Sequence, residues 1–538
     1  MTTPAPVQLT HRQILLVLSG LLLGMFLAAL DQTIVSTAMR TIADQLEGQT
    51  AQAWVITAYL IASTITTPLY GKLSDQYGRK PFYLFAIAAF VLGSILCGTA
   101  QSIYELAAYR AVQGVGAGGL MSLAFAIVGD LVPPRERGRY QGWFMAVFGV
   151  SSVLGPVVGG AFAGQATLLG IDGWRWIFYL NVPIGLLAMT VVLRTLHLPR
   201  RTSEHRIDYL GAALLTSAVV PLLLVAEKGR DWGWSSALSV GLLALSIGSI
   251  GSFVGWERRM GDEAILPPRV FSSSVFSLTS VTSLLVGAGM FGGLVVLPLY
   301  LQIVRGASPT AAGLQLIPLM VGIIITSGIA GRVMSRTGRY KLLPVVGIGL
   351  MFLALMSMST LAVDTPLWKA MAYMTLMGMG LGLSMQTLVI SVQNALPPSD
   401  MGVATSSVTF FRSMGGTFGA AVSLAVLFGS LVGNIQDRAR QAGLPPEVVA
   451  RFDSASSFDD TSVIATLPEA VRRAVLEGFA DSMSTVFVVI ALLLLPAFVL
   501  TLLVKEIPLR AQGGLAAAHA DADEAARAEA AKSETAVL

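Results

Sequence analysis

The chain has 538 residues, of which 54% are hydrophobic and only 12% are charged, and its mean hydropathy is +0.71. Soluble domains usually carry about 25% charged residues, so this composition indicates an integral membrane protein. The net charge of +4 would suit a nucleic-acid partner if the cations clustered on soluble faces, but they fall in short segments between apolar runs. The single cysteine, Cys97, excludes disulfides within the chain, and we expect no metal site and no cofactor.

Fourteen apolar runs are long enough to cross a bilayer, which takes roughly 20 residues of helix. They begin near Ile14, Trp54, Phe82, Leu106, Gln141, Trp176, Tyr209, Ala237, Val275, Thr310, Leu342, Trp368, Gly402 and Ser482. The sequence therefore predicts an all-α integral membrane protein with fourteen spans. Because that number is even, both termini should lie on the same side of the membrane.

Lysine and arginine gather in one alternate set of the segments between these runs. That set includes Lys72, Arg79, Lys80, Arg135, Arg137, Arg139, Arg200, Arg201, Arg206, Arg258, Arg259, Arg269, Arg336, Arg339 and Lys341. The other short segments are much poorer in cations. Since positively charged loops stay in the cytoplasm, we expect both termini to be cytoplasmic and the chain to sit in the cytoplasmic (inner) membrane.

The chain contains an internal duplication. The pattern Gly114-x-Gly-x-Gly118 recurs as Gly378-x-Gly-x-Gly382, an offset of 378 − 114 = 264 residues. Six spans take roughly 185 residues, so an offset near 264 leaves room for two more spans between the two halves. We expect a six-helix bundle at 1–198, two inserted transmembrane helices with linkers at 199–272, and a second six-helix bundle at 273–507. That second bundle contains a long extracytoplasmic loop at 431–480, and a low-complexity cytoplasmic tail follows at 508–538.

A charged segment bounded by glycines, Gly71-Lys-Leu-Ser-Asp75-Gln-Tyr-Gly78-Arg79-Lys80, separates the second and third apolar runs. Glycine permits a sharp reversal of the chain, and Asp75 can cap a helix start or pair with a cation. Arg79 and Lys80 favour a cytoplasmic turn. The spacing resembles the loop signature of the major facilitator superfamily of secondary transporters, where such a loop takes part in the conformational switch. The alternative is a generic positively charged turn.

Further segments resemble the signatures of drug:proton antiporters within that superfamily. They are Leu30-Asp31-Gln-Thr33-Ile-Val, Arg110-Ala-Val-Gln113-Gly114, Gly149-x5-Gly155-Pro156-x-x-Gly159-Gly160 and Trp174-Arg-Trp-Ile-Phe-Tyr-Leu-Asn181-Val-Pro183-Ile-Gly185. With fourteen predicted spans, the chain resembles the larger branch of these antiporters, which includes bacterial multidrug and quaternary-ammonium exporters. The resemblance implies two six-helix bundles plus two additional central helices, and export driven by inward proton flow.

Asp31 and Arg110 are the residues we expect to couple protons to transport. Asp31 lies about 17 residues into the first apolar helix, about 25 Å along it at 1.5 Å per residue, in the outer half of the membrane. An ionised carboxylate is costly there, so Asp31 is expected to take a proton from outside and release it inward. Arg110 is its natural partner, with Gln113 nearly one turn later on the same face. The alternatives are that Asp31 is permanently paired or bonded to backbone, and that Arg110 only anchors the bundle.

Two other intramembrane features are candidates for function. The fifth apolar run carries Gly149, Gly155, Pro156, Gly159 and Gly160, a pattern that permits close helix approach and interrupts one backbone hydrogen bond. In family terms this motif is linked to antiport rather than uptake. Arg412, in the thirteenth run, either binds an anionic substrate group or pairs with a neighbouring helix.

The 431–480 loop predicts an amphipathic helical hairpin over the outer mouth, because Thr466-Leu-Pro468-Glu469 fits a helix start. It would either contact a periplasmic partner or simply cap the last two spans. The other expected partners are a small lipophilic substrate, protons and membrane lipids, with no nucleic acid, and we expect a monomer.

The sequence leaves three classes of function open. The first is proton-coupled export of lipophilic drugs by alternating access. The second is proton-coupled transport of a specific metabolite or lipid, and the third is a membrane enzyme or scaffold. Enzymes would show paired histidines and carboxylates or a metal cluster near one membrane face, and the sequence shows neither, so we expect no enzymatic activity.

Overall fold

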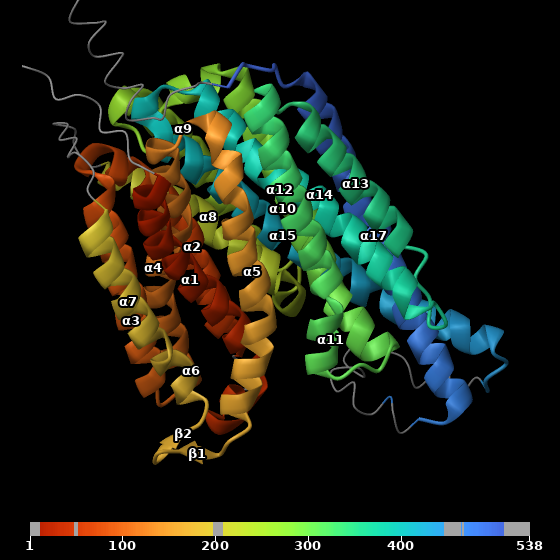
Figure 1. Ribbon diagram of the computed structural model, residues 1–538. Helices are drawn as coiled ribbons and strands as arrows, with labels where there is room; N and C mark the ends of the chain where they lie inside the picture. Colours follow the sequence, from red (N-terminus) through yellow and green to blue (C-terminus); the bar gives the residue numbers. More distant parts are fainter. Residues whose placement is uncertain (1–10, 48–51, 197–207, 446–463, 465–466, 510–538) are drawn as a thin grey trace, which may run out of the picture.

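The computed structural model describes residues 11–47, 52–196, 208–445, 464 and 467–509, and these are mostly α-helical (Figure 1). The first half comprises α1 (His11–Gln45), α2 (Gln52–Tyr77), α3 (Arg79–Thr99), α4 (Ile103–Leu131), α5 (Pro134–Ala163), α6 (Arg175–Tyr179) and α7 (Asn181–Thr195). Between α5 and α6 lies a small antiparallel hairpin of β1 (Thr167–Leu168) and β2 (Ile171–Asp172), with Thr167 opposite Asp172.

Two helices then separate the halves. These are α8 (Tyr209–Trp232) and α9 (Ala237–Met260), followed by the short turns η2 (Gly261–Glu263) and η3 (Pro268–Ser272). The second half comprises α10 (Ser274–Leu299), a π-helical turn η4 (Tyr300–Val304), α11 (Pro309–Gln315), α12 (Ile317–Thr337), α13 (Leu342–Met358), α14 (Leu367–Ala395), η5 (Pro398–Asp400), α15 (Met401–Gln441) and α17 (Glu469–Leu503).

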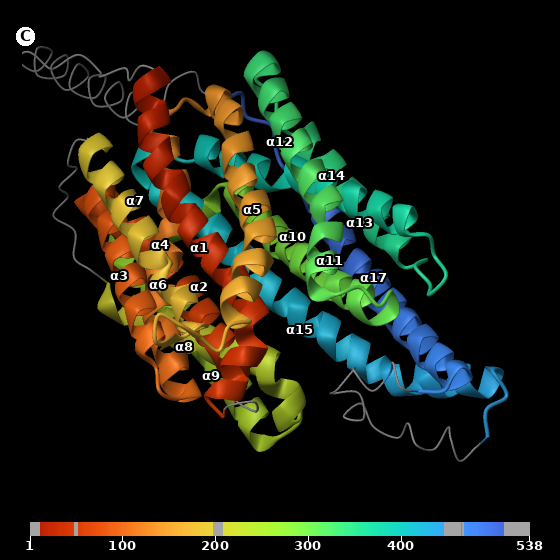
Figure 2. The ribbon, with the colours of Figure 1, turned by 60° about the horizontal axis from the view of Figure 1, so that its bottom comes forward.

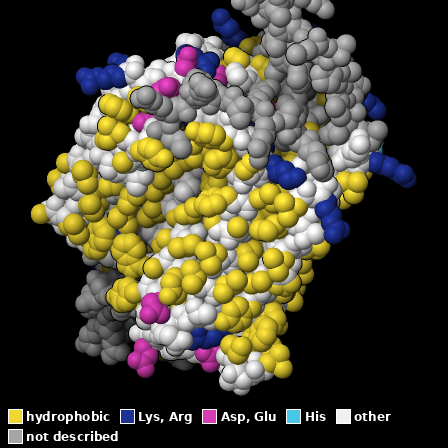
Figure 3. All heavy atoms as spheres, turned by 90° about the vertical axis from the view of Figure 1, so that its left-hand side faces the viewer, with side chains coloured by type: hydrophobic (Ala, Val, Ile, Leu, Met, Phe, Trp, Pro, Cys, Tyr) yellow, Lys and Arg dark blue, Asp and Glu magenta, His cyan; other side chains and the backbone are white. Residues whose placement is uncertain are grey.

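The helices are long and apolar because a bilayer offers no water to backbone groups, so each spanning segment must satisfy its own hydrogen bonds. Within the described residues, twelve helices are long and apolar enough to cross a membrane. Helices α2 and α13 are not among the twelve, and α13 has only 17 residues, so the count of fourteen crossings stays a prediction. Figure 3 shows one side of the molecule as a broad apolar band, with charged side chains toward its two ends.

The duplication seen in the sequence recurs in the helices. Helices α4 and α14 have equal lengths, and both their starts (367 − 103 = 264) and their ends (395 − 131 = 264) differ by the repeat offset. At the ends of α2 and α12, Gly78 and Gly338 both adopt positive φ angles, of 98° and 68°. Side chains other than glycine rarely adopt such angles, so the reversal after each helix depends on glycine.

The two halves meet along two seams. On one side α5 packs between α1 and α12, and on the other α2 packs against α15. Helix α8 packs against α2, α15 and α9, so the additional helices lie beside the second seam. The predicted domain boundary at 198/199 lies outside the described residues, and the boundary at 272/273 falls between η3 and α10. The domain division therefore remains a prediction.

The glycine-bounded segment differs from the turn that its sequence suggests. Helix α2 continues through Asp75 to Tyr77, and α3 begins at Arg79, so Gly78 alone separates the two helices. An ion pair between Asp75 and Arg79 spans this junction, with 2.5 Å between Oδ1 and the guanidinium. The charges that the sequence places in a loop thus lie on two helix ends, fixed against each other.

The predicted hairpin at 431–480 also differs in form. Its described parts extend the last two long helices, since α15 runs on to Gln441 and α17 begins at Glu469 and continues to Leu503. With 41 residues, α15 is roughly 62 Å long, about twice the thickness of a bilayer core. Figures 1 and 2 show α15 and α17 projecting together beyond the other helices. Arg438 joins them through two bonds to Asp481, of 2.6 and 2.9 Å. Residues 446–463 and 465–466 of this loop lie outside the described residues.

Candidate functional site

Asp31 lies on α1 and is completely buried. Its Oδ2 accepts a hydrogen bond from the Arg110 guanidinium of α4 at 2.5 Å. Its Oδ1 accepts from two side-chain amides, Gln113 Nε2 and Asn181 Nδ2, each at 2.8 Å. Both carboxylate oxygens therefore have donors, and three helices converge on one acid.

A second ring of contacts fixes these donors. Gln113 Oε1 accepts from Arg110 at 2.7 Å, and Ser94 Oγ of α3 accepts from Gln113 and Asn181 at 3.2 and 2.9 Å. The guanidinium also lies over the ring of Tyr59 on α2, 4.1 Å from its centroid, where the aromatic face attracts a cation. We call Asp31, Arg110, Gln113, Asn181 and Ser94 the Asp31 cluster. Its members hold one another in place, and Asn181 Oδ1 is its one buried side-chain oxygen without a hydrogen-bond partner among the described residues.

This arrangement links charge to helix position. Ions buried in a low-dielectric interior are stable only as well-bonded pairs, and removing one partner leaves an expensive unpaired charge. The bonds of Asp31 to Arg110, Gln113 and Asn181 therefore hold α1, α4 and α7 together.

The sequence predicted part of this cluster. The structure brings together Asp31, Arg110 and Gln113, all three named as site candidates from the sequence. Asn181 stands in one of the quoted motifs but was given no role, and Ser94 was not singled out at all. The only available signal was that both are polar residues at positions otherwise surrounded by apolar ones.

The glycine pattern of α5 separates onto two faces of that helix. A Cβ at Gly155 would collide with the Thr33 side chain, and one at Gly159 would press on Ile34, so this face packs closely on α1 just after Asp31. Thr33 Oγ1 also donates to the Ser151 carbonyl of α5 at 3.0 Å. By contrast, a Cβ at Gly160 would meet no atom within 4 Å.

The other face of α5 points at the second half. A Cβ at Gly149 would lie 3.4 Å from Ile324 of α12, and one at Gly313 of α11 would lie 3.6 Å from Pro156. Helix α5 therefore connects the helix that carries Asp31 with the seam between the halves.

A second polar cluster closes the end of the molecule where α2 ends and α15 begins, which we call the Asp75 end; the β1–β2 hairpin lies at the opposite end (Figure 1). Arg79 contacts the carboxylates of Asp75 and Asp130 at 2.5 and 2.8 Å, and the Ser74 hydroxyl at 2.6 Å. Lys80 does not join this group, because its Nζ donates to the Leu193 carbonyl at 2.8 Å.

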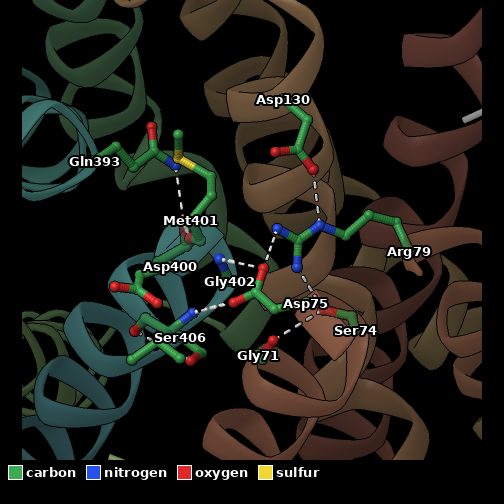
Figure 4. A network of polar contacts seen from close by, with 12 residues as sticks. Gly71, Ser74, Asp75, Arg79, Asp130, Gln393, Asp400, Met401, Gly402 and Ser406 are labelled. Atoms are coloured by element: carbon green, nitrogen blue, oxygen red, sulfur yellow. Dashed lines mark hydrogen bonds and ion pairs between the residues drawn. The ribbon is translucent and has the colours of Figure 1, made fainter. Parts of the chain in front are cut away.

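Asp75 crosses to the second half of the molecule (Figure 4). Its two carboxylate oxygens accept from the backbone N–H groups of Gly402 and Val403, each at 3.0 Å. A helix N-terminus has unsatisfied N–H groups and a partial positive charge, both of which favour a carboxylate. A Cβ at Gly71 would collide with Ser406, so glycine at 71 permits this close approach.

Side chains make further bridges at the same end. Arg137 of α5 donates to Gln393 Oε1 of α14, Lys72 Nζ donates to the Asp262 carbonyl, and Arg269 pairs with Asp400 at 3.0 Å. The Asp75 end is therefore closed by contacts from both halves and from the segment that follows α9.

Arg412 lies apart from both clusters. It is partly buried on α15, and the described residues offer it no hydrogen bond or ion pair. A Cβ built on Gly287 of α10 would collide with the Arg412 carbonyl oxygen, so α10 and α15 are in close contact there. Among the described residues, no group of three or more histidine, cysteine or acidic side chains could hold a metal ion.

These features define a class of protein. Duplicated helical halves in a membrane, closed at one end by contacts between them and holding a buried ion pair within one of them, are the architecture of a secondary transporter. The chain belongs to the Major Facilitator Superfamily, whose model matches residues 21–420. It is accordingly a multi-pass membrane transporter rather than an enzyme.

Named relatives agree with this class. The chain is 36% identical over 415 residues to the multidrug transporter protein MdtP of Bacillus subtilis, covering 77% of this chain and 75% of the relative. It is 33% identical over 480 residues to multidrug resistance protein 3 of the same bacterium, covering 88% and 91%. An uncharacterised MFS-type transporter of Mycobacterium tuberculosis, Rv1877, is 39% identical over 495 residues, covering 92% and 70%.

Solved structures share the fold. The proton:xylose symporter XylE superposes with a TM-score of 0.58 at 16% identity, covering 92% of this chain and 96% of that one. The human organic anion transporter MFSD10 gives a TM-score of 0.57 at 15% identity, covering 91% and 100%. At such identities the likeness establishes the fold alone.

Proposed function

We propose that this transporter is a proton-driven antiporter that exports lipophilic compounds from the cytoplasm. The observation that carries the proposal is the Asp31 cluster, in which a fully buried carboxylate is held by Arg110. Relatives at 33% and 36% identity are named for multidrug transport or resistance, which supports lipophilic compounds as the substrate class.

The cluster suggests how protons drive movement. Ionised Asp31 holds α1 to α4 through Arg110 and to α7 through Asn181. Proton uptake by Asp31 removes its charge and weakens both contacts, so the helices can rearrange. One proton moving through about 100 mV supplies about 2.3 kcal/mol, enough to accumulate substrate tens of times against its gradient.

The orientation follows from loop charge. Lys72, Arg79, Arg137 and Arg269 all lie at the Asp75 end, and positively charged connections stay in the cytoplasm. The Asp75 end therefore faces the cytoplasm in this proposal, which puts both termini there. With this orientation, the contacts of the Asp75 end close the cytoplasmic side.

Transport by inside-out vesicles tests the proposal. Acidifying the vesicle interior should drive uptake of a lipophilic dye, and collapsing the pH gradient should stop it. The Asp31→Asn variant keeps the shape of the side chain but cannot release a proton, so it should lose gradient-driven uptake while its amount in the membrane stays unchanged. Full gradient-driven uptake by Asp31→Asn would remove Asp31 as the coupling site.

A further inference from the structure

Two buried carboxyl groups lie at adjoining ends of the additional helices, away from the Asp31 cluster. Asp208 precedes α8, and its Oδ1 accepts from Gly211 N at 2.7 Å and Trp256 Nε1 at 2.8 Å. Glu257 lies near the end of α9, and its Oε2 accepts from Leu266 N at 2.9 Å. Asp208 and Glu257 are only 5% and 3% exposed.

Each acid also has an oxygen without a donor. Asp208 Oδ2 and Glu257 Oε1 are buried and have no hydrogen-bond partner. Both lie beside the same point, since a Cβ built on Gly211 would contact Asp208 Oδ2 and would lie 2.8 Å from Glu257 Oε1. The two oxygens are therefore at most 2.2 + 2.8 = 5.0 Å apart, and the two carboxyl groups lie side by side. Ionised carboxylates can only accept hydrogen bonds, so two ionised carboxylates in this position cannot hydrogen-bond to each other.

No cation of the described residues neutralises this pair. The charged groups on the surrounding elements include Arg258 and Arg259 on α9, Asp262 and Glu263 on η2, Arg269 on η3, Lys72 on α2 and Asp400 just before α15. Arg258 and Arg259 are exposed, Arg269 pairs with Asp262 and Asp400, and Lys72 donates to the Asp262 carbonyl. None of these cations forms an ion pair with Asp208 or Glu257 within the described residues.

We infer that Asp208 and Glu257 share one proton, held between Asp208 Oδ2 and Glu257 Oε1. A proton on either oxygen turns that group into a donor to the other, which satisfies both orphaned atoms at once. Two like charges in contact in a buried site cannot both ionise readily, so one proton belongs to the pair rather than to either residue.

The position of this proton site connects it to the closed end. Glu257 Oε2 holds the Leu266 amide, in the segment between η2 and η3. The two turns that flank this segment make the connections: Arg269 of η3 pairs with Asp400 at the start of α15, and the Asp262 carbonyl of η2 accepts from Lys72 of α2. Loss of the shared proton leaves two negative charges side by side, which pushes the ends of α8 and α9 apart and loosens this segment. The inference goes beyond the proposed antiport and does not depend on the role of Asp31.

Infrared spectroscopy of the purified full-length protein tests the shared proton. Wild-type protein should show the carbonyl band of a protonated carboxyl group near neutral pH, and both Asp208→Asn and Glu257→Gln should remove it. Each amide supplies an N–H donor to the remaining carboxylate and makes the proton unnecessary. Glu263→Gln, which neutralises an acid on η2 outside the pair, should keep the band. A band that survives in both amide variants, or that Glu263→Gln also removes, would overturn the inference.

Hydrogen exchange supplies a second, independent readout. In the wild-type protein, exchange of peptide 261–273, relative to intrinsic rates, should speed up over the same pH range in which the carboxyl band disappears. Glu257→Ala should raise that exchange about tenfold, because the Leu266 amide loses a bond to a charged or polar acceptor. Glu257→Gln should leave it slow at all pH values. Exchange that does not change when the band disappears would contradict the link between the proton and this segment.

Discussion

Asp75 and Gly402 are 327 residues apart in the chain, yet the carboxylate of the first accepts the backbone N–H of the second at 3.0 Å. The two residues belong to opposite halves of the duplicated fold. Since Arg79 holds the same carboxylate, the contact joins a buried ion pair to the start of α15. This makes Asp75 the residue that most directly ties the halves together at that end.

Asp75→Asn should weaken closure of the Asp75 end. The asparagine keeps one oxygen to accept a backbone N–H group but lacks the negative charge of the carboxylate. Its NH₂ group, itself a donor, would face the other backbone N–H group at the start of α15. Hydrogen bonds to charged groups are worth about 1.5–3 kcal/mol, so the open population should rise about tenfold or more. Distances between spin labels at Tyr77→Cys and Arg339→Cys report the change, since the one native cysteine, Cys97, is buried.

Ser335→Ala is the matched control for this measurement. Ser335 lies three residues before Gly338, as Asp75 lies three residues before Gly78, and its hydroxyl donates to the Arg332 carbonyl within its own helix. It should leave the distance distribution unchanged. An Asp75→Asn distribution indistinguishable from that of Ser335→Ala would show that the Asp75 contact does not hold the end closed.

Gly155→Ala and Gly160→Ala test the packing of α5 on α1. The added methyl at 155 would collide with Thr33, whereas the one at 160 meets open space. Overpacking costs about 1–3 kcal/mol, so Gly155→Ala should lower the thermal unfolding midpoint of the purified protein and reduce export. Gly160→Ala should keep or slightly raise the midpoint, because alanine favours helix. Equal midpoints for the two variants would argue against a tight α1–α5 contact.

Asn181→Ala tests whether the amide donor to Asp31 contributes to transport. The variant removes the bonds to Asp31 and Ser94 but keeps Arg110 in place. Loss of one bond to a charged group should lower export about tenfold. Asn434→Ala, which removes a bond to Ser482 at 2.8 Å on the projecting helices, is the control and should export normally. Unchanged dye export by Asn181→Ala would show that the Asn181 amide does not contribute to transport.

Much of the fold follows from the sequence because membrane helices must satisfy their backbones internally. The predicted starts of the fourteen runs all fall at or within a helix of the structure, and the repeat offset reappears in α4 and α14. What the sequence did not predict was the continuity of two helices through charged segments, at Gly71–Tyr77 and beyond 431. Charge suggested a turn in the first place, and a separate helical hairpin was expected in the second. Helices α15 and α17 instead extend into the 431–480 segment, where Arg438 of α15 pairs with Asp481 of α17.

The sequence predicted site residues only where an ionisable side chain stands within an apolar run. A carboxylate and a guanidinium inside apolar runs indicate function, so Asp31 and Arg110 could be paired from the sequence. The partners of Asp75 on α15 are backbone N–H groups, which every residue but proline carries, so no sequence pattern identifies them. Likewise, Asp208 and Glu257 meet only because α8 and α9 fold against each other.

Proton release on substrate binding is the sharpest test of the proposal that Asp31 exchanges a proton for substrate. A lipophilic cationic dye that the wild-type protein exports is added to purified protein in weakly buffered detergent solution, and the pH is followed. Wild-type protein should release protons as the dye binds, and Asp31→Asn, with an unchanged unfolding midpoint, should bind the dye and release none. Equal proton release by Asp31→Asn and wild type would show that Asp31 is not the group that exchanges a proton for substrate.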